Sequence, residues 1–275
     1  MTSTTLTPQR GPVQAQPPTG VSWWFSDVWE MTLRNIRHLL RSPELVMFSL
    51  VQPVLFILLF TYVFGGAIDI GGGEYAQFLL PGIFVQMALY GSAAGTTIGI
   101  AAEMRTGLMD RFRSMPMSRT AVLVGRTLSE VFRNVCAMAV MVLIGMLVGF
   151  RFLNGFLPAL VGMLLLLLFG YAVSWLGAFI GLSVRSAEAA QAAGGVWIFP
   201  FTLISSAFVP TETMPGWLQV YAEHSPMTAA VNALRALFSG GPAGSWVLQT
   251  VAWSIGLIIV FGGLSVRRYG SLTNR

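Results

Sequence analysis

The residues that could do acid–base, nucleophilic or metal chemistry are few in this sequence, and they are scattered. The histidines His38 and His224 lie far apart, and the single cysteine, Cys136, lies within an apolar run. All sixteen basic residues are arginines, since the sequence contains no lysine. A nucleotide-binding P-loop needs the lysine of G-x-x-x-x-G-K-[ST] to reach the phosphates. The chain is therefore predicted not to be an enzyme, with no catalytic residue, no metal ligand and no ATPase site of its own.

The composition predicts a membrane protein. Hydrophobic residues make up 55% of the chain and charged residues only 10%, whereas a soluble domain carries about 25% charged residues. The formal charge of +5 raises the question of a nucleic-acid partner. The arginines cluster at the ends of apolar runs, however, and this pattern is typical of membrane topology. No nucleic-acid partner is predicted.

Six apolar runs are long enough to cross a bilayer, for which a helix needs about 20 residues. The predicted fold class is therefore an all-α membrane protein with six transmembrane helices. The predicted spans are Leu45–Phe64, Phe78–Ala101, Ala121–Phe150, Phe156–Val184, Ala189–Val209 and Trp246–Val266. The predicted organisation is a disordered cytoplasmic tail (1–20), an interfacial helix (21–44), the six-span domain (45–268) and a cytoplasmic tail (269–275).

The arginines predict the orientation of these spans. Fourteen of the sixteen fall on one side of the six-span arrangement, and only Arg151 and Arg235 fall on the other. Because positive residues remain on the cytoplasmic side, both termini are predicted to be cytoplasmic.

The segment before the first span predicts an amphipathic helix that lies in the membrane interface. Aromatic and aliphatic residues gather on one side of it and arginines on the other. The residues singled out are Trp24, Trp29, Arg34, Arg37 and Arg41. Anchoring alone would explain the pattern, and contact with a cytosolic partner is the alternative.

The third span begins with charge. Arg126, Glu130 and Arg133 stand at positions i, i+4 and i+7, so Glu130 can pair with both arginines. This pattern indicates a salt-bridged cytoplasmic extension of the helix. The alternative is a hinge that receives force from the loop before it.

The stretch between the fifth and sixth spans, Val209–Gly244, is too polar to cross a membrane. Two amphipathic pieces bounded by prolines, Trp217–Glu223 and Met227–Phe238, predict short helices. They either pack at the outer surface or form a lid over an exit path. The residues singled out are Glu212, Pro215, Trp217, Glu223, His224, Pro226 and Asn232.

The loop between the second and third spans reads "RTGLMDRFRSMPMSR". A short helix with charges and an aromatic anchor is one way for a protein to fit the groove of another. The alternative is a loop whose arginines fix topology and bind anionic headgroups. The predicted docking residues are Leu108, Asp110, Arg111, Phe112, Arg113, Ser114, Met115 and Pro116.

Three stretches resemble the ABC-2 type permeases, and most closely the DrrB-like drug-efflux subunits of actinobacteria. They are "YAQFLLPGI" (75–83), "GLMDRFRSMPMSRTAVLVGR" (107–126) and "SSAFVPTETMPGWLQVYAEHSPMTAAVNALRAL" (205–237). The resemblance implies a bacterial plasma-membrane exporter built from two permeases, identical or related, and two cytosolic ABC ATPase subunits. It implies an interfacial helix at 22–42, a coupling helix at 106–117 that rests on the ATPase, and re-entrant helices at 212–240. ATP and Mg²⁺ would then be bound by the partner ATPase, and no cofactor by this chain.

The spans hold few charges, so the transported molecule is predicted to be hydrophobic or amphiphilic, such as a drug. Guesses for the pathway wall are Met87, Tyr90, Phe199 and Phe201, since Met and aromatic side chains adapt to varied apolar ligands. One alternative is a permease of the same architecture that exports a lipid-linked glycan or cell-envelope precursor. A secondary carrier and a scaffold that transports nothing are more distant alternatives. A nucleotide-dependent complex with an ATPase would distinguish the two kinds of ABC permease from the secondary carrier and the scaffold.

Overall fold

In the computed structural model, the residues described are 21–41, 43–59, 62, 75–106, 119–184, 186–208, 211 and 214–273. Within these ranges the ordered elements are helical and none is a strand, which confirms the all-α class. The helices are α1 (Val21–Leu40), α2 (Pro43–Leu59), α3 (Tyr75–Arg105), α5 (Arg119–Leu147), α6 (Phe156–Gly181), α7 (Ala187–Gly195), α8 (Ile198–Leu203), α9 (Gly216–His224), α10 (Pro226–Ser239) and α11 (Gly244–Thr273).

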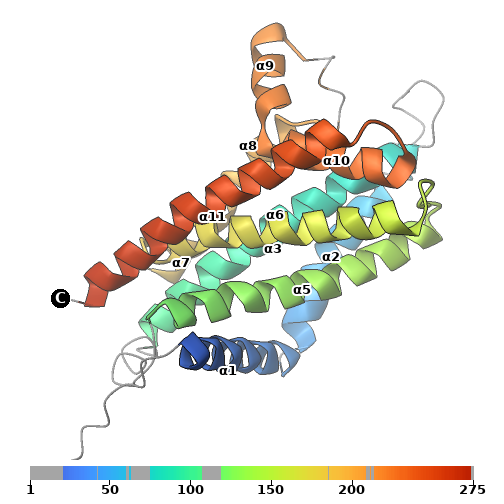
Figure 1. Cartoon of the computed structure of the whole chain (residues 1–275). Helices are drawn as coiled ribbons and strands as arrows, with labels where there is room; N and C mark the ends of the chain where they lie inside the picture. The colour runs from blue at the N-terminus through green and yellow to red at the C-terminus, as the bar shows by residue number, and fades with distance from the viewer. Residues whose placement is uncertain are drawn as a thin grey trace, which may run out of the picture.

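The long helices α3, α5, α6 and α11 form a bundle, and α6 packs against each of the other three (Figure 1). Helix α1 lies at one end of the bundle against α5, near the C-terminus of the chain, and α10 lies at the opposite end. We refer to these as the α1 end and the α10 end. Helix α9 stands away from the bundle at the α10 end (Figure 1).

Four helices in the described ranges, α3, α5, α6 and α11, are long and apolar enough to cross a membrane. They correspond to the second, third, fourth and sixth predicted spans. The first predicted span overlaps α2, whose 17 residues include Pro53 in the helix interior. The total of six spans therefore stays a prediction.

The fifth predicted span, Ala189–Val209, is not one continuous helix. Helix α7 ends at Gly195, a turn occupies Val196 and Trp197, and α8 ends at Leu203. Glycine has low helix propensity, and Gly194 and Gly195 both fall in the last turn of α7. At Gly194 an added Cβ would also lie 3.1 Å from the Ala94 Cα of α3, so α7 closely approaches α3 where it ends.

The start of α7 is capped by a side chain. The Ser186 hydroxyl oxygen accepts a hydrogen bond from the Ala189 N–H at 3.0 Å, the usual arrangement at a helix N-terminus. Hydrogen bonding from its own backbone, and then from the Ser186 side chain, holds the pKa of the exposed Glu188 carboxyl below its usual range. Nearby Arg105 adds to the effect.

The α10 end is held by interlocked aromatic rings. Phe84, Phe150, Phe152 and Phe238 meet edge to face, with ring centroids 5.1–6.5 Å apart. The N–H groups of Leu153 and of the next residue donate to the Phe238 carbonyl, which ties the α5–α6 turn to α10. Such pairs add specific geometry to the burial of apolar area, so they fix the position of α10.

Glycine permits two very close backbone approaches, one near each end of the bundle. A Cβ at Gly82 of α3 would overlap the Ala207 carbonyl oxygen, and one at Gly177 of α6 would lie 2.6 Å from the Ala93 carbonyl oxygen. Small residues let membrane helices pack closely. No flexible side chain fills these contacts, so a larger residue would have to move backbone.

The predicted outer pieces Trp217–Glu223 and Met227–Phe238 are both helical, as α9 and α10. Most of α10 is buried against α3, α6 and α11, whereas α9 has one buried residue, Ala222. Helix α10 is therefore part of the packed bundle, whereas α9 is largely exposed; the choice between surface packing and a lid stays a prediction.

At the α1 end, one stripe of α1 packs on α5. Val28 and Met31 are buried, and a Cβ at Gly125 of α5 would lie 2.6 Å from the Met31 Cβ. The indole of Trp24 donates to the Thr120 hydroxyl at 2.9 Å. On the other side of α1, Trp29 is 63% exposed, so α1 combines a protein-facing stripe with an exposed aromatic one.

The end of α11 also lies in this region. The helix continues to Thr273 through most of the predicted C-terminal tail. Tyr269 is buried in a cluster with Trp175 and Leu123, so the first residue assigned to the tail belongs to the packed structure.

Candidate functional site: a charged cluster shared by three helices

The predicted docking residues Leu108, Asp110, Arg111, Phe112, Arg113, Ser114, Met115 and Pro116 lie outside the described residues. The helices on either side of them are described: α3 ends at Arg105 and α5 begins at Arg119. A force delivered to 107–118 would therefore reach α3 and α5 first. The side chains that join these two helices form the candidate site.

Glu130 is the centre of this site. Its side chain is only 6% exposed, and its Oε2 lies 2.6 Å from Arg133 Nε, while its Oε1 lies 3.5 Å from Arg126 Nη2. The predicted pairing of Glu130 with both arginines is confirmed. It follows from spacings of three and four residues, which bring side chains onto one helical face.

The cluster continues beyond α5. Glu103 Oε1 of α3 lies 2.9 Å from Arg34 Nη2 of α1 and 3.7 Å from Arg126 Nη1 of α5. The charged cluster, defined as Arg34, Glu103, Arg126, Glu130 and Arg133, thus joins three helices that are separate in the sequence. Three guanidinium groups and two carboxylates give it a net charge of +1.

Arg34 therefore has a different place from the other arginines of α1. The sequence put it on the polar side of an interfacial helix, and its side chain is turned toward Glu103, with 37% exposed. Arg37 and Arg41 are exposed. Sequence reasoning did not single out Glu103. The available signal was its status as the only acidic residue in α3, because a lone carboxylate near the end of a span needs a cation.

Three glycines of α3 make room for the arginines. Gly91, Gly95 and Gly99 recur every four residues on one face, beneath the side chains of Arg133 and Arg126. A Cβ would lie 3.0 Å from Arg133 Nη2 at Gly91 and 2.9 Å from it at Gly95. At Gly99 a Cβ would overlap the Arg126 guanidinium. This glycine strip, G-x-x-x-G-x-x-x-G, was present in the sequence and was missed.

Not every guanidinium nitrogen in the charged cluster has a hydrogen-bond partner among the described residues. Arg126 Nη2 approaches the Gly95 carbonyl at 3.4 Å, whereas Arg126 Nε and Arg133 Nη2 are buried without a hydrogen-bond partner among the described residues. Buried charged groups without partners are costly. The two carboxylates are therefore needed to keep these guanidinium groups in the bundle.

A neutral polar pair lies next to the cluster. Asn134 Nδ2 donates to the Ser92 hydroxyl at 2.7 Å between α5 and α3. A Cβ at Gly170 would lie 2.8 Å from the same Asn134 nitrogen. The amide thus fits into a space that only glycine leaves open on α6.

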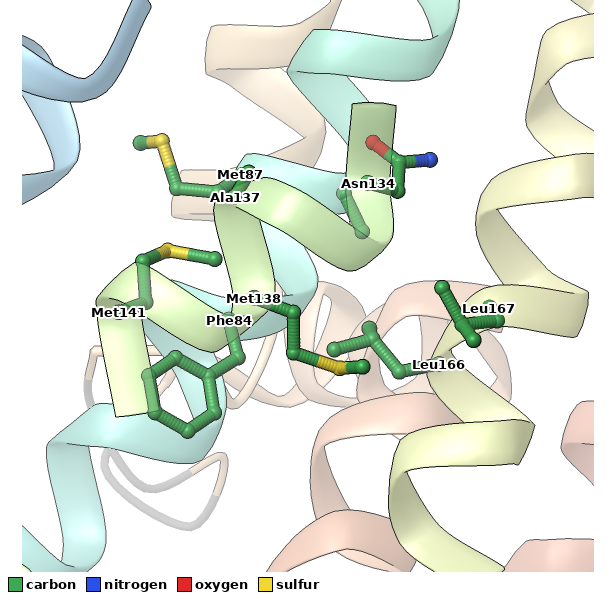
Figure 2. A pocket seen from close by; sticks show the side chains of 9 residues that line it. Phe84, Met87, Asn134, Ala137, Met138, Met141, Leu166 and Leu167 are labelled. Carbon is green, nitrogen blue, oxygen red and sulfur yellow. The ribbon is translucent and has the colours of Figure 1, made fainter. Parts of the chain in front are cut away.

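Asn134 also borders a small cavity of about 20 Å³ between α3, α5 and α6, lined by Met87, Met138 and Met141 among others (Figure 2). A water needs room and two to four polar partners, and Asn134 is the one polar residue in the lining. The cavity is therefore a small apolar packing space and too small for a transported molecule.

The four pathway guesses do not meet at one site. Met87 lines this buried cavity, whereas Tyr90 and Phe199 are 41% and 60% exposed on the surface. Phe201 meets the Trp197 ring edge to face, with centroids 5.6 Å apart. The assignment of these residues to a pathway stays a prediction.

The predicted outer residues fall around α9 and α10, apart from Glu212, which is outside the described residues. Pro215 precedes α9, Trp217 is 77% exposed, and Pro226 begins α10. The Asn232 Oδ1 accepts a hydrogen bond from the Ser206 hydroxyl at 3.0 Å. Glu223 and His224 lie at the end of α9.

Sequence reasoning used Arg235 only for topology, but the residue fastens α10 to its neighbours. Its Nε donates to the Phe78 carbonyl at 2.9 Å and its Nη2 to the Ala207 carbonyl at 3.1 Å. The guanidinium also lies 3.6 Å from the Phe78 ring centroid, a cation–π geometry. A charged residue between two apolar spans was the signal for such a role.

Titratable side chains capable of holding a metal do not gather anywhere in the described ranges. The charged cluster is an ion-pair network that connects α1, α3 and α5.

Comparison with known proteins gives a consistent picture. Residues 26–239 match the family described as ABC-2 type transporter. The daunorubicin resistance ABC transporter permease protein DrrB1 of Streptomyces coeruleorubidus is 36% identical over 252 residues, covering 91% of this chain and 87% of that protein. The probable doxorubicin resistance ABC transporter permease protein DrrC of Mycobacterium tuberculosis is 27% identical over 235 residues, covering 83% of each chain. The putative transport permease ycf38 of Cyanophora paradoxa is 23% identical over 248 residues, covering 89% of this chain and 84% of that protein.

Proposed function

Since this chain belongs to the ABC-2 type transporter family, we propose that it is the permease subunit of an ATP-driven drug exporter in a bacterial plasma membrane. Its cargo is a hydrophobic or amphiphilic small molecule. Relatives named for daunorubicin and doxorubicin resistance support this class of cargo over a glycan precursor. Two cytosolic ATPase subunits bind ATP and Mg²⁺ and supply the energy, and a second permease copy completes the membrane part.

The observation that carries this proposal is the charged cluster. It joins α3 and α5, the helices on either side of residues 107–118, and adds α1 through Arg34. A permease driven by a separate ATPase needs its cytoplasmic contact to be mechanically connected to its spans. Ion pairs that hold both flanking helices together meet that need.

In this mechanism, closure of the ATPase dimer displaces 107–118, and the displacement reaches α3 and α5 together. The glycine strip offers a smooth surface along α3, so the arginines of α5 can change position on it without a steric barrier. Such a step would contribute to alternating access, in which parts of the transporter rock around a central site. The proposed role of this chain is to convert ATPase movement into opening on the two sides of the membrane.

The test is co-expression with a candidate P-loop ATPase encoded beside this chain, followed by purification with and without ATP and measurement of daunorubicin export from vesicles. Phe112→Ala combined with charge reversal at Arg111 and Arg113 should reduce export strongly while the membrane part remains folded. Glu30→Gln, at an exposed position of α1, is the matched control and should export normally. No nucleotide-dependent complex with any ATPase, or full export by the triple variant, would refute the proposal.

A further inference from the structure

A second cavity lies at the α10 end, whereas the charged cluster lies toward the α1 end. It has a volume of about 870 Å³ and is bordered by α9, α10 and α11. Small-molecule sites typically measure about 300–1,000 Å³, so the cavity has the size to hold a drug-like molecule. It lies within a single chain and needs no second copy to form its walls.

The local backbone explains why this space is open. Ser225 has an extended conformation and caps α10, with its hydroxyl oxygen accepting from the Met227 N–H at 3.2 Å. The chain therefore turns sharply there, and α9 stands away from the bundle while α10 stays packed in it (Figure 1). The α11 wall includes two small residues, Ala252 and Gly256, and a Cβ at Gly256 would meet nothing within 4 Å.

The lining of the cavity carries one negative charge, that of Glu223. Glu223 at the end of α9 accepts one hydrogen bond, from Gln219 Nε2 to its Oε1 at 2.8 Å. Its Oε2 accepts none from the described residues. His224 borders the same space, and its Nδ1 faces the Val220 carbonyl at 2.9 Å. A carbonyl oxygen can only accept, so His224 Nδ1 is the donor in this contact.

No cationic side chain among the described residues balances this carboxylate at the cavity. The arginine of α10, Arg235, is directed toward the Phe78 and Ala207 carbonyls and lies over the Phe78 ring. The polar lining that remains, which includes Asn232 and Gln249, is neutral. The charge of the cavity therefore suits a cationic ligand.

The α11 wall supplies aromatic surface. Trp246 and Trp253 are seven residues apart, which places them on the same face two turns apart, with Gln249 between them. Trp253 is 44% exposed. Indole faces attract both planar apolar groups and cations. A ligand that contacts both this wall and Glu223 needs an apolar body and a positively charged group, so it is amphiphilic.

We propose that the cavity between α9, α10 and α11 is a binding site for an amphiphilic organic cation. Glu223 contacts the positive group, and Trp246 and Trp253 hold the apolar body. If the chain is an exporter subunit, this cavity is a cargo site at the α10 end. The inference therefore rests on the proposed function, and it narrows the cargo to cationic amphiphiles. The same chemistry is offered by a drug with an amine or by an amine-bearing lipid headgroup, and the test separates these two sources.

The test is calorimetric titration of the purified full-length chain in detergent with tetraphenylphosphonium, a lipophilic cation, and with the pair dodecylamine and dodecanol. Glu223→Gln should raise the Kd of the two cations about threefold to tenfold and leave dodecanol binding unchanged. Trp253→Ala should weaken the binding of tetraphenylphosphonium by about tenfold. The control Glu30→Gln removes a carboxylate from an exposed position on α1 and should bind like the parent chain.

A repeat in nanodiscs identifies the source of the cation. If tetraphenylphosphonium binds more weakly in nanodiscs that contain phosphatidylethanolamine than in nanodiscs of phosphatidylcholine alone, the site takes a lipid amine. If its Kd is the same in both, the site takes a soluble cationic amphiphile. Both results support the cation site. Equal Kd values for the parent chain and Glu223→Gln, in protein with unchanged thermal stability, would overturn it. Binding is measured on this chain alone, so loss of the ATPase complex refutes the proposed function without affecting this result.

Discussion

Removal of the Glu130 carboxylate is the sharpest perturbation of the charged cluster. The change Glu130→Gln keeps the side-chain volume and removes the charge that holds Arg133 at 2.6 Å and Arg126 at 3.5 Å. The net charge of the cluster rises from +1 to +2, in a place where the Glu130 side chain is 6% exposed and each arginine 19%. Arg126 Nε and Arg133 Nη2 already lack hydrogen-bond partners among the residues that the structure describes.

The expected loss of stability follows from this burial. Breaking a buried ion pair by removal of one partner costs about 3–5 kcal/mol, because the remaining charge is left uncompensated. For a chain of this size, each kcal/mol corresponds to a shift of about 2–4 °C in Tm. Glu130→Gln should therefore lower the Tm of the detergent-solubilised protein by roughly 6–20 °C, as followed by tryptophan fluorescence.

Two further variants decide whether the ion pair is the cause. Glu30→Gln, at an exposed carboxylate, should leave the Tm within about 2 °C of the parent, since exposed substitutions typically change stability by less than about 0.5 kcal/mol. The double variant Glu130→Gln/Arg133→Gln removes a charge of each sign and should recover part of the loss. A Tm for Glu130→Gln that matches Glu30→Gln, or additive losses in the double variant, would contradict the reasoning.

Three other changes test separate contacts. Gly82→Ala should lower the Tm, because its Cβ would overlap a backbone carbonyl, whereas Gly263→Ala, with open space around it, should raise stability by up to about 1 kcal/mol; equal Tm values would disprove the close approach. Asn134→Ala should cost about 1–3 kcal/mol by leaving the Ser92 hydroxyl without its donor, as measured by denaturant unfolding. The pKa of Glu188 is lowered in the folded state, so its charge stabilises the start of α7 at pH values above the ordinary carboxyl pKa. This stabilisation is lost as the pH falls through the folded-state pKa. Glu188→Gln should therefore flatten the dependence of Tm on pH between about pH 6 and 3.

Local spacing was enough to predict part of the site. The pairing of Glu130 with Arg126 and Arg133 follows from positions on one face of one helix, so it needs no knowledge of the fold. The helical outer pieces were predicted for a similar reason, because they are amphipathic and are bounded by prolines in the sequence. Features set by residues three or four apart can be read directly from a sequence.

Contacts between distant segments could not be predicted in this way. Arg34 and Glu103 are 69 residues apart, and their contact depends on the angle at which α1 crosses α5. The interruption between α7 and α8 was missed because apolar composition alone suggested a span there, whereas the helix ends at a glycine pair that packs on α3. The glycine strip of α3 was visible, but its meaning depended on knowing that two arginines lie over it.

Helices α3 and α5 make different kinds of contact along their length, and this difference indicates where these two helices can move. At the α10 end, Gly82 meets a backbone carbonyl and Phe84 interlocks with Phe150 and Phe238, so any shift there breaks close packing. At the α1 end, flexible arginine side chains lie over a strip without side chains, and a carboxylate can follow them. Relative movement of α3 and α5 is therefore least costly at the α1 end, which is also the end where residues 107–118 connect these two helices.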